Sequence, residues 1–253
     1  MNDETREQYA RTRLLLGQDG LDRLRQARVA VFGVGGVGGY VVEALARSGV
    51  GALDLIDDDK VCLSNLNRQI IATRSTLGMY KVDAAVARVR DIDPEIVVRT
   101  YKTFYTPETA DQFDFTQYSY VVDAIDTVTG KLSLVMQAKA AGVPIICSMG
   151  AGNKLDPSRF EVADLYETSV CPLARVMRAE CRKRGVDHLK VVYSKEPPLA
   201  PLAEEETPET APAAARPGAP KKRVPGSIAF VPSAAGLVLA GEVIRDLSGV
   251  SQK

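Results

Sequence analysis

The sequence predicts an α/β protein built on a doubly wound, Rossmann-like and mostly parallel sheet with a C-terminal extension of strands and helices. Three features predict it: a β-branched run that ends in glycine, a helical stretch directly after that glycine, and a second apolar run. These features form a βαβ unit, which implies parallel strands joined by right-handed crossovers. The alternation continues to Gly150, as a doubly wound sheet requires.

The elements of this first part follow in order along the chain. β-branched runs predict the strands, and apolar residues at helical spacing, such as Val82, Val86 and Val89, predict the helices. The expected strands are 27–33, 52–58, 96–101, 118–124 and 144–150, and the expected helices are 37–48, 79–90 and 131–141. Asp93 followed by Pro94 is expected to stop the helix before it.

The residues after Gly150 look like additions to the same sheet. The expected additions are a turn at 150–158, a strand at 159–168, a basic helix at 173–185 and a strand at 188–194. Pro, Ala and Glu dominate residues 197–226, which predicts a mobile loop. A strand followed by a helix rich in small residues is expected at 227–247.

Length and composition narrow the class of protein. We expect one domain over 1–253, with a core of about 10–150 and an extension of 151–253. Lys and Arg balance Asp and Glu, so no overall field marks a nucleic-acid or membrane binder. The four cysteines form no C-x-x-C pair, the first ten residues lack an apolar run, and no stretch approaches a membrane span. We therefore expect a cytoplasmic protein without a membrane partner.

A glycine-rich turn follows the first expected strand. Gly33, Gly35 and Gly38 form a G-x-G-x-x-G array, and Gly36 adds a further small residue. Such a turn brings backbone N–H groups and a helix N-terminus against a phosphate. Asp57 ends the next strand, where a carboxylate can accept hydrogen bonds from a ribose hydroxyl. The alternative is glycine packing beside a solvated acidic loop, but strand, turn, helix and acid together favour a nucleotide.

Two kinds of nucleotide chemistry compete at this point: a dinucleotide held for hydride transfer, or a nucleoside triphosphate held for adenylyl transfer. Displacing pyrophosphate builds negative charge that Arg, Lys and a metal must stabilise. Arg68 and Lys81 supply positive charge, Asn65 can donate an amide, and Asp126 is placed to hold Mg²⁺. Each residue has a plainer interpretation, as a surface cation or a helix cap. Together they favour ATP with Mg²⁺.

The combination GVGGVG, IDDDKVCLSNLNRQ, Lys81 and DAIDT resembles the ThiF/MoeB/HesA superfamily, which is related to ubiquitin-activating enzymes. The resemblance covers about 10–150 and implies activation of a carboxylate as an acyl-adenylate with ATP and magnesium. It implies that Gly36 lies by the phosphates and that Asp57 takes the ribose. It further implies roles for the remaining site residues: Asn65, Arg68 and Lys81 on the triphosphate, and Asp126 with Thr127 closing the metal and nucleotide site.

The resemblance also implies a homodimer, in which an N-terminal arginine of one subunit reaches the phosphates of the other. Arg11 is the candidate for this role, and Arg13 is the alternative. Within the superfamily, RLLLGQDGL, YSYVVDAIDTVTGK, GAGNKLDPS and CPLARVMRAECRKRG resemble the branch that cyclises threonylcarbamoyladenosine in tRNA by dehydration. That branch implies a tRNA substrate.

The cysteine pattern agrees with this branch. Members that adenylate ubiquitin-like sulfur carriers commonly hold structural zinc with two C-x-x-C pairs, which this chain lacks. Ring closure needs no transferable thioester, since proximity within one substrate replaces covalent catalysis. Cys171, next to Pro172 at a helix start, is the thiol best placed for a chemical role, with simple packing as the alternative.

Other functions remain open on the sequence alone. The chain would alternatively adenylate the C-terminus of a sulfur-carrier protein, or act as a non-catalytic nucleotide-binding scaffold, with a cysteine desulfurase or another sulfur-transfer protein as partner. A tRNA partner would need local positive charge, and the alternative is a solvated helix face. The candidate cluster is Arg175, Arg178, Arg182, Lys183, Arg184, Lys190 and Lys195, with Lys221, Lys222 and Arg223 in the loop.

Overall fold

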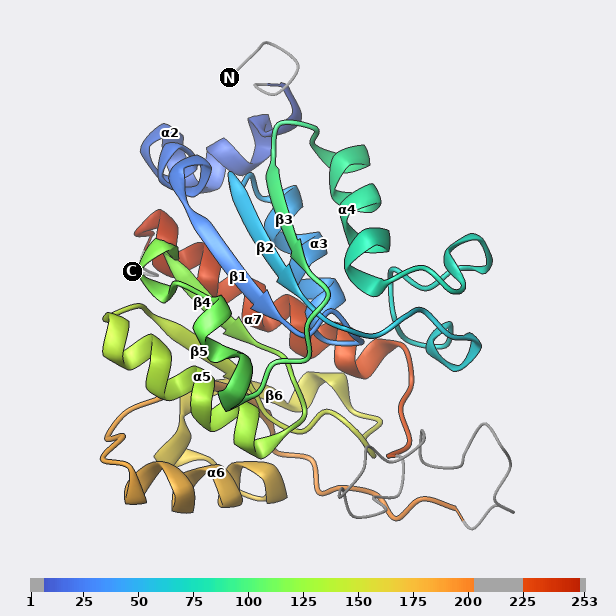
Figure 1. Cartoon of the computed structure of the whole chain (residues 1–253), viewed down its shortest axis with the longest axis vertical. Helices are drawn as coiled ribbons and strands as arrows, with labels where there is room; N and C mark the ends of the chain where they lie inside the picture. Colours follow the sequence, from blue (N-terminus) through green and yellow to red (C-terminus); the bar gives the residue numbers. More distant parts are fainter. Residues whose placement is uncertain (1–6, 203–224, 251–253) are drawn as a thin grey trace.

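Seven strands form one sheet in the computed structural model, which describes residues 7–202 and 225–250 (Figure 1). The strands are β1 (Arg28–Phe32), β2 (Ala52–Ile56), β3 (Val97–Tyr101), β4 (Tyr120–Asp123), β5 (Ile145–Ser148), β6 (Phe160–Asp164) and β7 (Lys190–Ser194). Their order is β3-β2-β1-β4-β5-β7-β6. Every neighbouring pair is parallel except β6 and β7. The predicted doubly wound and mostly parallel sheet, with added strands, is confirmed.

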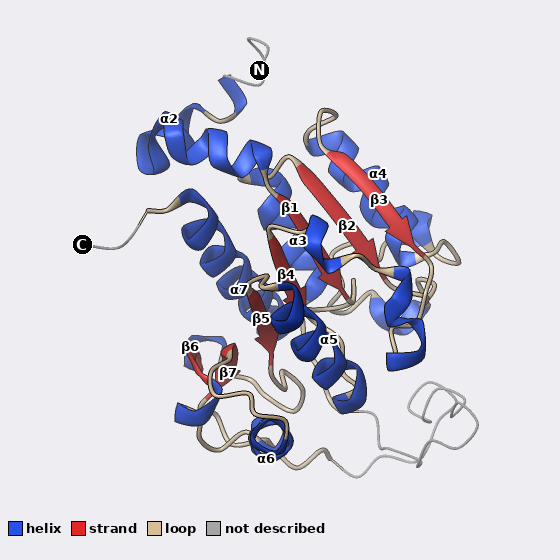
Figure 2. Ribbon diagram, turned by 60° about the vertical axis from the view of Figure 1, so that its left-hand side comes forward, coloured by secondary structure: helices blue, strands red, loops and turns tan. Residues whose placement is uncertain are grey.

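Helices cover both faces of this sheet (Figure 2). They are α2 (Ala10–Gln26), α3 (Gly38–Arg47), α4 (Lys81–Ile92), α5 (Val128–Ala141), α6 (Pro172–Lys183) and α7 (Phe230–Ser248). One buried cluster joins the sheet to α3, α4 and α7, and a second joins it to α5 and α6. The C-terminal α7 therefore packs beside the N-terminal α3, although the two are far apart in the sequence.

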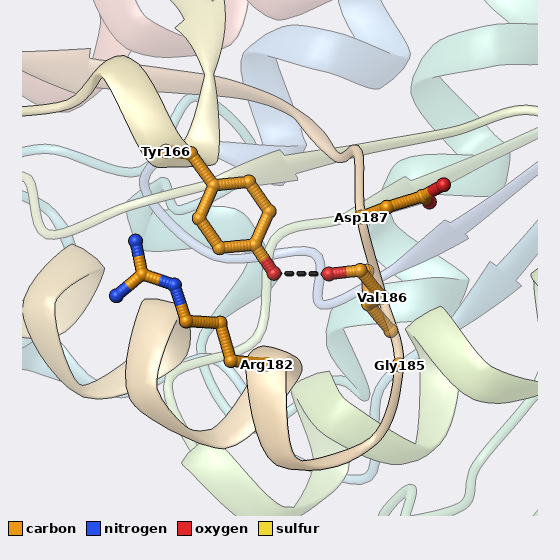
Figure 3. Close-up of a pocket in the computed structure, with 5 residues that line it drawn as sticks. All are labelled: Tyr166, Arg182, Gly185, Val186 and Asp187. Atoms are coloured by element: carbon orange, nitrogen blue, oxygen red, sulfur yellow. Dashed lines mark hydrogen bonds between the residues drawn. The ribbon is translucent and has the colours of Figure 1, made fainter.

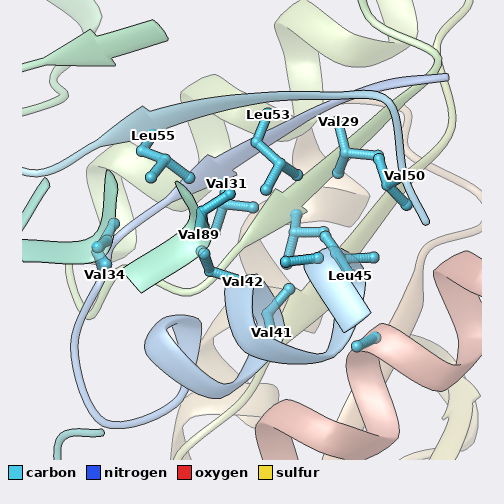
Figure 4. Packing of buried hydrophobic residues seen from close by; sticks show 14 of the residues in the cluster. Val29, Val31, Val34, Val41, Val42, Leu45, Val50, Leu53, Leu55 and Val89 are labelled. Atoms are coloured by element: carbon cyan, nitrogen blue, oxygen red, sulfur yellow. The ribbon is translucent and has the colours of Figure 1, made fainter. Parts of the chain in front are cut away.

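The first cluster shows why the apolar runs become buried strands (Figure 4). Val31 of β1 and Leu55 of β2 face Val42 and Leu45 of α3, and all four side chains are buried. Each fully buried Val or Leu side chain stabilises the fold by about 1.5–3 kcal/mol relative to an exposed one. This packing holds the end of β1 rigidly, and the glycine-rich turn begins there.

Two details differ from the sequence-based expectations. The strand expected before the last helix is wrong: residues 225–228 have no regular structure, and α7 begins at Phe230. Pro232 lies in the first turn of α7, where its missing N–H would have no partner within the helix. The helix α2 was not expected. It contains a kink at Gly17, which adopts a φ of 71°.

In the rest of the extension, each described helix or strand is of the kind that the sequence predicted. β6, α6 and β7 occupy the predicted strand, helix and strand, with β6 antiparallel to β7. Residues 197–202 and 225–226 form no helix or strand, and 203–224 of the predicted loop lie outside the described residues. Among the described helices, none combines the length and apolarity that a membrane span requires.

Candidate active site

The strand order reverses between β1 and β4, so the carboxyl ends of these two strands diverge into different loops. In open α/β sheets this switch point is where ligands bind. The glycine-rich turn leaves β1 here, and the loop containing Asp126 leaves β4 beside it. Gly33 adopts a φ of 89°, and a Cβ on it would lie 2.7 Å from the carbonyl oxygen of Ala124. Only glycine allows the two loops to approach this closely.

The turn itself leaves an open face at the start of α3. A Cβ on Gly38 would lie 1.8 Å from the carbonyl oxygen of Gly33, so this glycine closes the turn. At Gly35, by contrast, the nearest atom to such a Cβ is Nε2 of Gln69 at 3.8 Å. The N–H groups of Gly35 and Gly36 have no acceptor within residues 7–202 and 225–250. Unpaired N–H groups at a helix N-terminus form an anion-binding position.

Asp57 fastens this turn to the end of β2. Its carboxylate accepts hydrogen bonds from the N–H of Val34 at 2.7 Å and from the N–H of Asp59 at 2.9 Å. The side chain is 9% exposed, and burial raises the pKa of Asp57 against the opposing effect of the Lys81 charge. A carboxylate offers about four acceptor positions, so these two bonds leave room for a ribose hydroxyl.

Lys81, the first residue of α4, brings positive charge to the same loop. Its side chain is buried, and its Nζ donates to Asp59 at 2.7 Å and lies 3.6 Å from Asp57. Two of the predicted site residues, Asp57 and Lys81, are therefore adjacent in space. An ammonium group has three donors, so Lys81 can hold Asp59 and still contact a phosphate.

Asn65 ends the short 3₁₀ segment Leu63–Asn65 that follows Asp57, and Arg68 lies in the turn after it. The Cγ of Arg68 lies 3.6 Å from the position of a Cβ on Gly36, which places this side chain against the glycine turn. Its guanidinium donates to the carbonyl of Ser64 and to Asn67, and it makes no ion pair within the described part of the chain. Asn65 is buried, and its Oδ1 accepts from the N–H of Cys62 at 3.2 Å.

Asp126 and Thr127 follow β4 on the same edge. Thr127 is the N-cap residue of α5, so Asp126 does not cap that helix. Asp126 is exposed, and among the described residues it has no hydrogen-bond or ion-pair partner. A free carboxylate at a phosphate site fits Mg²⁺, which uses one or two protein carboxylates together with phosphates and water.

The other acidic group at this edge fits a metal less well. Carboxylate oxygens of Asp57, Asp58 and Asp59 lie within 4.8 Å of one another. Asp57 and Asp59, however, already accept hydrogen bonds from backbone N–H groups and from Lys81. Their charge therefore positions Lys81, whose ammonium group opposes a second cation there, and Asp126 remains the predicted metal ligand.

Arg11 lies at the opposite edge of the sheet. The hydroxyl of Tyr9, two residues before Arg11, lies 2.7 Å from Asp93 and 3.0 Å from the carbonyl of Ala46, so its one proton is shared between them. Both partners are at the ends of α3 and α4 that lie away from the glycine turn. One chain therefore does not bring Arg11 to its own candidate site. Arg11 and the alternative Arg13 are both exposed on α2.

The thiol considered from the sequence is buried, and several residues of the basic cluster pair with acidic side chains. Cys171 is 2% exposed and is the N-cap residue of α6, so it packs at a helix entry. Arg184 and Lys183 pair with Glu180, Lys190 with Glu242 and Asp246, and Lys195 with Glu161. These ion pairs neutralise much of the cluster. Lys221, Lys222 and Arg223 lie outside the described residues.

Arg182 from the same cluster lies at a hollow on the extension (Figure 3). This hollow of about 400 Å³ is lined by Tyr166, Arg182 and residues 185–187. The guanidinium of Arg182 lies 5.2 Å from the centroid of the Tyr166 ring, and the Tyr166 hydroxyl donates to the carbonyl of Val186. The guanidinium of Arg182 therefore makes a cation–π contact within the extension.

The sequence analysis did not identify two residues that lie against the glycine turn. Gln69 faces Gly35, and Pro232 of α7 lies 3.3 Å from the position of a Cβ on Gly36. Gln69 directly follows Arg68 in the motif, which is a signal that the sequence contained. The approach of Pro232 depends on the packing of α7 and has no such local signal.

Comparisons with known proteins agree with this geometry. A model described as the ThiF family matches residues 8–253. The chain belongs to the ThiF family. This ThiF-family chain is 44% identical to a tRNA threonylcarbamoyladenosine dehydratase of Bacillus subtilis, over 95% of the chain and 94% of that protein. The predicted superfamily and its dehydratase branch are confirmed by this match.

A solved structure and a more distant relative complete the comparison. The crystal structure of Escherichia coli tRNA N6-threonylcarbamoyladenosine dehydratase in complex with ATP superimposes with a TM-score of 0.84 at 32% identity. The match covers 98% of this ThiF-family chain and 96% of that one. An adenylyltransferase and sulfurtransferase of Aspergillus terreus is 34% identical, but over 57% of the chain and 30% of its own length.

Proposed function

We propose that this ThiF-family chain uses ATP to activate the carboxylate of threonylcarbamoyladenosine in tRNA as an acyl-adenylate, which then closes into a ring with loss of water. The observation that carries the proposal is the meeting of the glycine turn, Arg68, Lys81 and Asp126 at one switch point of the sheet. The resemblance to dehydratases over nearly the whole chain supports this substrate. The sulfur-carrier alternative is supported only over a shorter part of the chain.

The roles of the residues follow from their charges and positions. The N–H groups of Gly35 and Gly36 hold phosphate, and Asp57 accepts from the ribose. Lys81 and Arg68 stabilise the negative charge that develops as pyrophosphate leaves, and Asn65 donates its amide to a phosphate oxygen. Asp126 and Thr127 close the site. Mg²⁺, held by Asp126, neutralises phosphate charge when it is bound.

The cyclisation needs positioning more than a nucleophilic side chain. The nucleophile and the activated carboxylate belong to the same substrate molecule, so proximity supplies much of the acceleration. Cys147, Cys171 and Cys181 are buried, and Cys62 is exposed in the loop between Asp57 and Asn65. Ring closure within one substrate molecule requires a thioester on none of them.

The assay that tests the function measures AMP release from labelled ATP under three conditions: with tRNA carrying threonylcarbamoyladenosine, with a sulfur-carrier protein that ends in Gly-Gly, and with neither. We expect AMP release and cyclised tRNA only in the first condition. The Lys81→Met variant serves as the matched inactive control. Release that depends on the carrier would replace the proposal with the alternative, and no release in any condition would favour a scaffold.

We further propose a cytoplasmic homodimer in which Arg11 of one subunit contacts phosphate in the other. Three observations support the dimer: Arg11 is distant from its own glycine turn, it is exposed, and Leu14 and Leu15 beside it are 85% and 81% exposed. Two adjacent exposed leucines are suited to an interface core. The domain proposal, one unit over 1–253, is supported by β6 and β7, which join the same sheet.

Mixing two inactive variants tests the contribution of Arg11. Arg11→Ala lacks the arginine, and Lys81→Met lacks the lysine, so each homodimer has two defective sites. A mixed dimer has one intact site if Arg11 acts across the interface, so random mixing should restore about a quarter of wild-type activity. Mixing that restores no activity, while sedimentation confirms mixed dimers, would show that Arg11 does not act in this way.

A further inference from the structure

Gln69 is a buried side chain whose polar group is unsatisfied. The residue is 6% exposed, and its Oε1 has no hydrogen-bond partner in the described part of the molecule. Its main chain is fully used, because its N–H donates to Asn65 and its carbonyl accepts from Ala72. Among the described residues no other buried side-chain oxygen or nitrogen is left unpaired. A buried and unpaired amide is costly, which calls for an explanation.

The position of this amide points to the ligand that satisfies it. Nε2 of Gln69 lies 3.8 Å from where a Cβ of Gly35 would stand, and it is the one atom within 4 Å of that point. The carboxamide therefore faces the open side of the glycine turn. Arg68, the preceding residue, lies against Gly36 on the same turn. Gln69 thus borders the position where unpaired N–H groups would hold phosphate.

We propose that the carboxamide of Gln69 is a nucleotide-binding group of this site. Its NH₂ donates to a phosphate oxygen seated at Gly35. Its Oε1, which the protein encloses here, accepts from a hydroxyl of the same ligand once the side chain turns on binding. The amide has one donor end and one acceptor end. A nucleoside triphosphate offers both partners, since its phosphates accept and its ribose hydroxyls donate. The inference rests on the proposed function only in taking ATP as the ligand.

Two substitutions separate this role from simple packing. Gln69→Met keeps the size and removes the amide, and Gln69→Glu keeps the shape and adds negative charge. We expect the Met variant without ligand to melt at least as high as the wild type, because an unpaired polar group has gone. We expect its Kd for ATP to rise about fivefold to tenfold, and that of the Glu variant to rise more than tenfold.

The measurements use the full-length protein, calorimetry with ATP, and parallel titrations with inorganic triphosphate, which lacks the ribose. The Met variant should lose more affinity for ATP than for triphosphate. Gln112→Met, at an exposed glutamine on the 3₁₀ segment Pro107–Gln112, serves as the matched control and should bind ATP as the wild type does.

The outcomes distinguish this inference from the proposed function. A Kd for ATP within twofold of wild type in both Gln69 variants would overturn the inference, and so would a Met variant that melts well below wild type with unchanged ATP affinity. If the Met variant does not fold, the Glu variant alone is tested, by the ratio of its Kd for ATP to that of the wild type. These titrations contain no tRNA, so failure of tRNA-dependent AMP release leaves this inference standing. A wild-type protein that binds no ATP would overturn both.

Discussion

Asp59 holds Lys81 through two hydrogen bonds. The carboxylate of Asp59 accepts from Nζ of Lys81 at 2.7 Å, and its carbonyl accepts from the N–H of Lys81 at 2.9 Å. The N–H of Asp59 in turn donates to Asp57 at 2.9 Å. This series of bonds connects the end of β2 to the first residue of α4. It explains how residues far apart in the sequence bring a carboxylate and an ammonium group to one position.

Asp59→Asn is expected to strengthen ATP binding. The substitution keeps the backbone bond that positions Lys81 and removes a negative charge that repels phosphate and offsets the Lys81 ammonium charge. The Asp59 side chain is 59% exposed, so the ion pair contributes about 0.2–1 kcal/mol and ATP affinity should rise roughly 1.4-fold to fivefold. Calorimetric titration measures this change, with Asp22→Asn on α2 as the control for loss of a surface charge. Unchanged or weaker ATP affinity would show that the Asp59 charge does not oppose ATP binding.

Lys81→Met is expected to lower AMP release about 10²- to 10³-fold, because charge on the leaving phosphates is no longer stabilised.

The Lys81→Met substitution should also change the pH dependence of ATP binding. Burial raises the pKa of Asp57, and the Lys81 charge opposes that shift. Loss of the Lys81 charge should therefore raise the pKa of Asp57 further. Asp57 then becomes protonated at higher pH, and the acidic limit of ATP binding should move upward. An acidic limit at the wild-type pH would contradict this coupling.

Asp126→Asn is expected to raise the Mg²⁺ concentration needed for half-maximal AMP release. Asp126 is exposed and has no described partner, so its removal should change the free energy of unfolding by less than about 0.5 kcal/mol. Titration of Mg²⁺ against activity, together with chemical denaturation, separates the two effects. A variant with the wild-type Mg²⁺ requirement would remove Asp126 from the metal site.

Lys131→Met is expected to destabilise the fold severely. Lys131 and Asp123 are both fully buried, with Nζ of Lys131 3.0 Å from Asp123 and 2.7 Å from the carbonyl of Ser148. Removing one partner leaves a buried charge unpaired, which costs about 3–5 kcal/mol. The midpoint of urea unfolding measures this loss. Replacing both partners, as Asp123→Leu with Lys131→Met, should be less harmful than Lys131→Met alone, and equal loss in both would contradict the explanation.

Glu43 is expected to contribute stability that is lost in acid. Burial alone would raise the pKa of Glu43, but hydrogen bonds from Arg88 and Arg47 outweigh it and lower the pKa below 4.5. A carboxyl with a lowered pKa stabilises the folded state above its ordinary value and loses that contribution as pH falls through the lower one. The wild type should therefore exceed Glu43→Gln in stability near neutral pH and lose this advantage below about pH 4.5. A pH-independent difference would contradict this assignment.

Most of the sheet could be predicted because its strands are buried on both faces. β1, β4 and β5 are therefore almost entirely apolar, and short apolar runs between glycine and helical patterns are unambiguous in such a fold. The same rule wrongly predicted a strand at 227–230, because SIAF is an apolar and partly β-branched run. The structure makes it the entry to α7, because Pro232 and the contact with the glycine turn favour a helix there.

The sequence by itself determined the alternation of strands and helices, the glycine turn, and the acidic and basic residues at the ends of parallel strands. Those features are local, and parallel strands bring their carboxyl ends to one edge in any register. Only the tertiary structure decided that Asp59 holds Lys81, that Gln69 is buried beside Gly35, and that Arg11 lies at the opposite edge. Each of these depends on distances between segments that local propensity does not set.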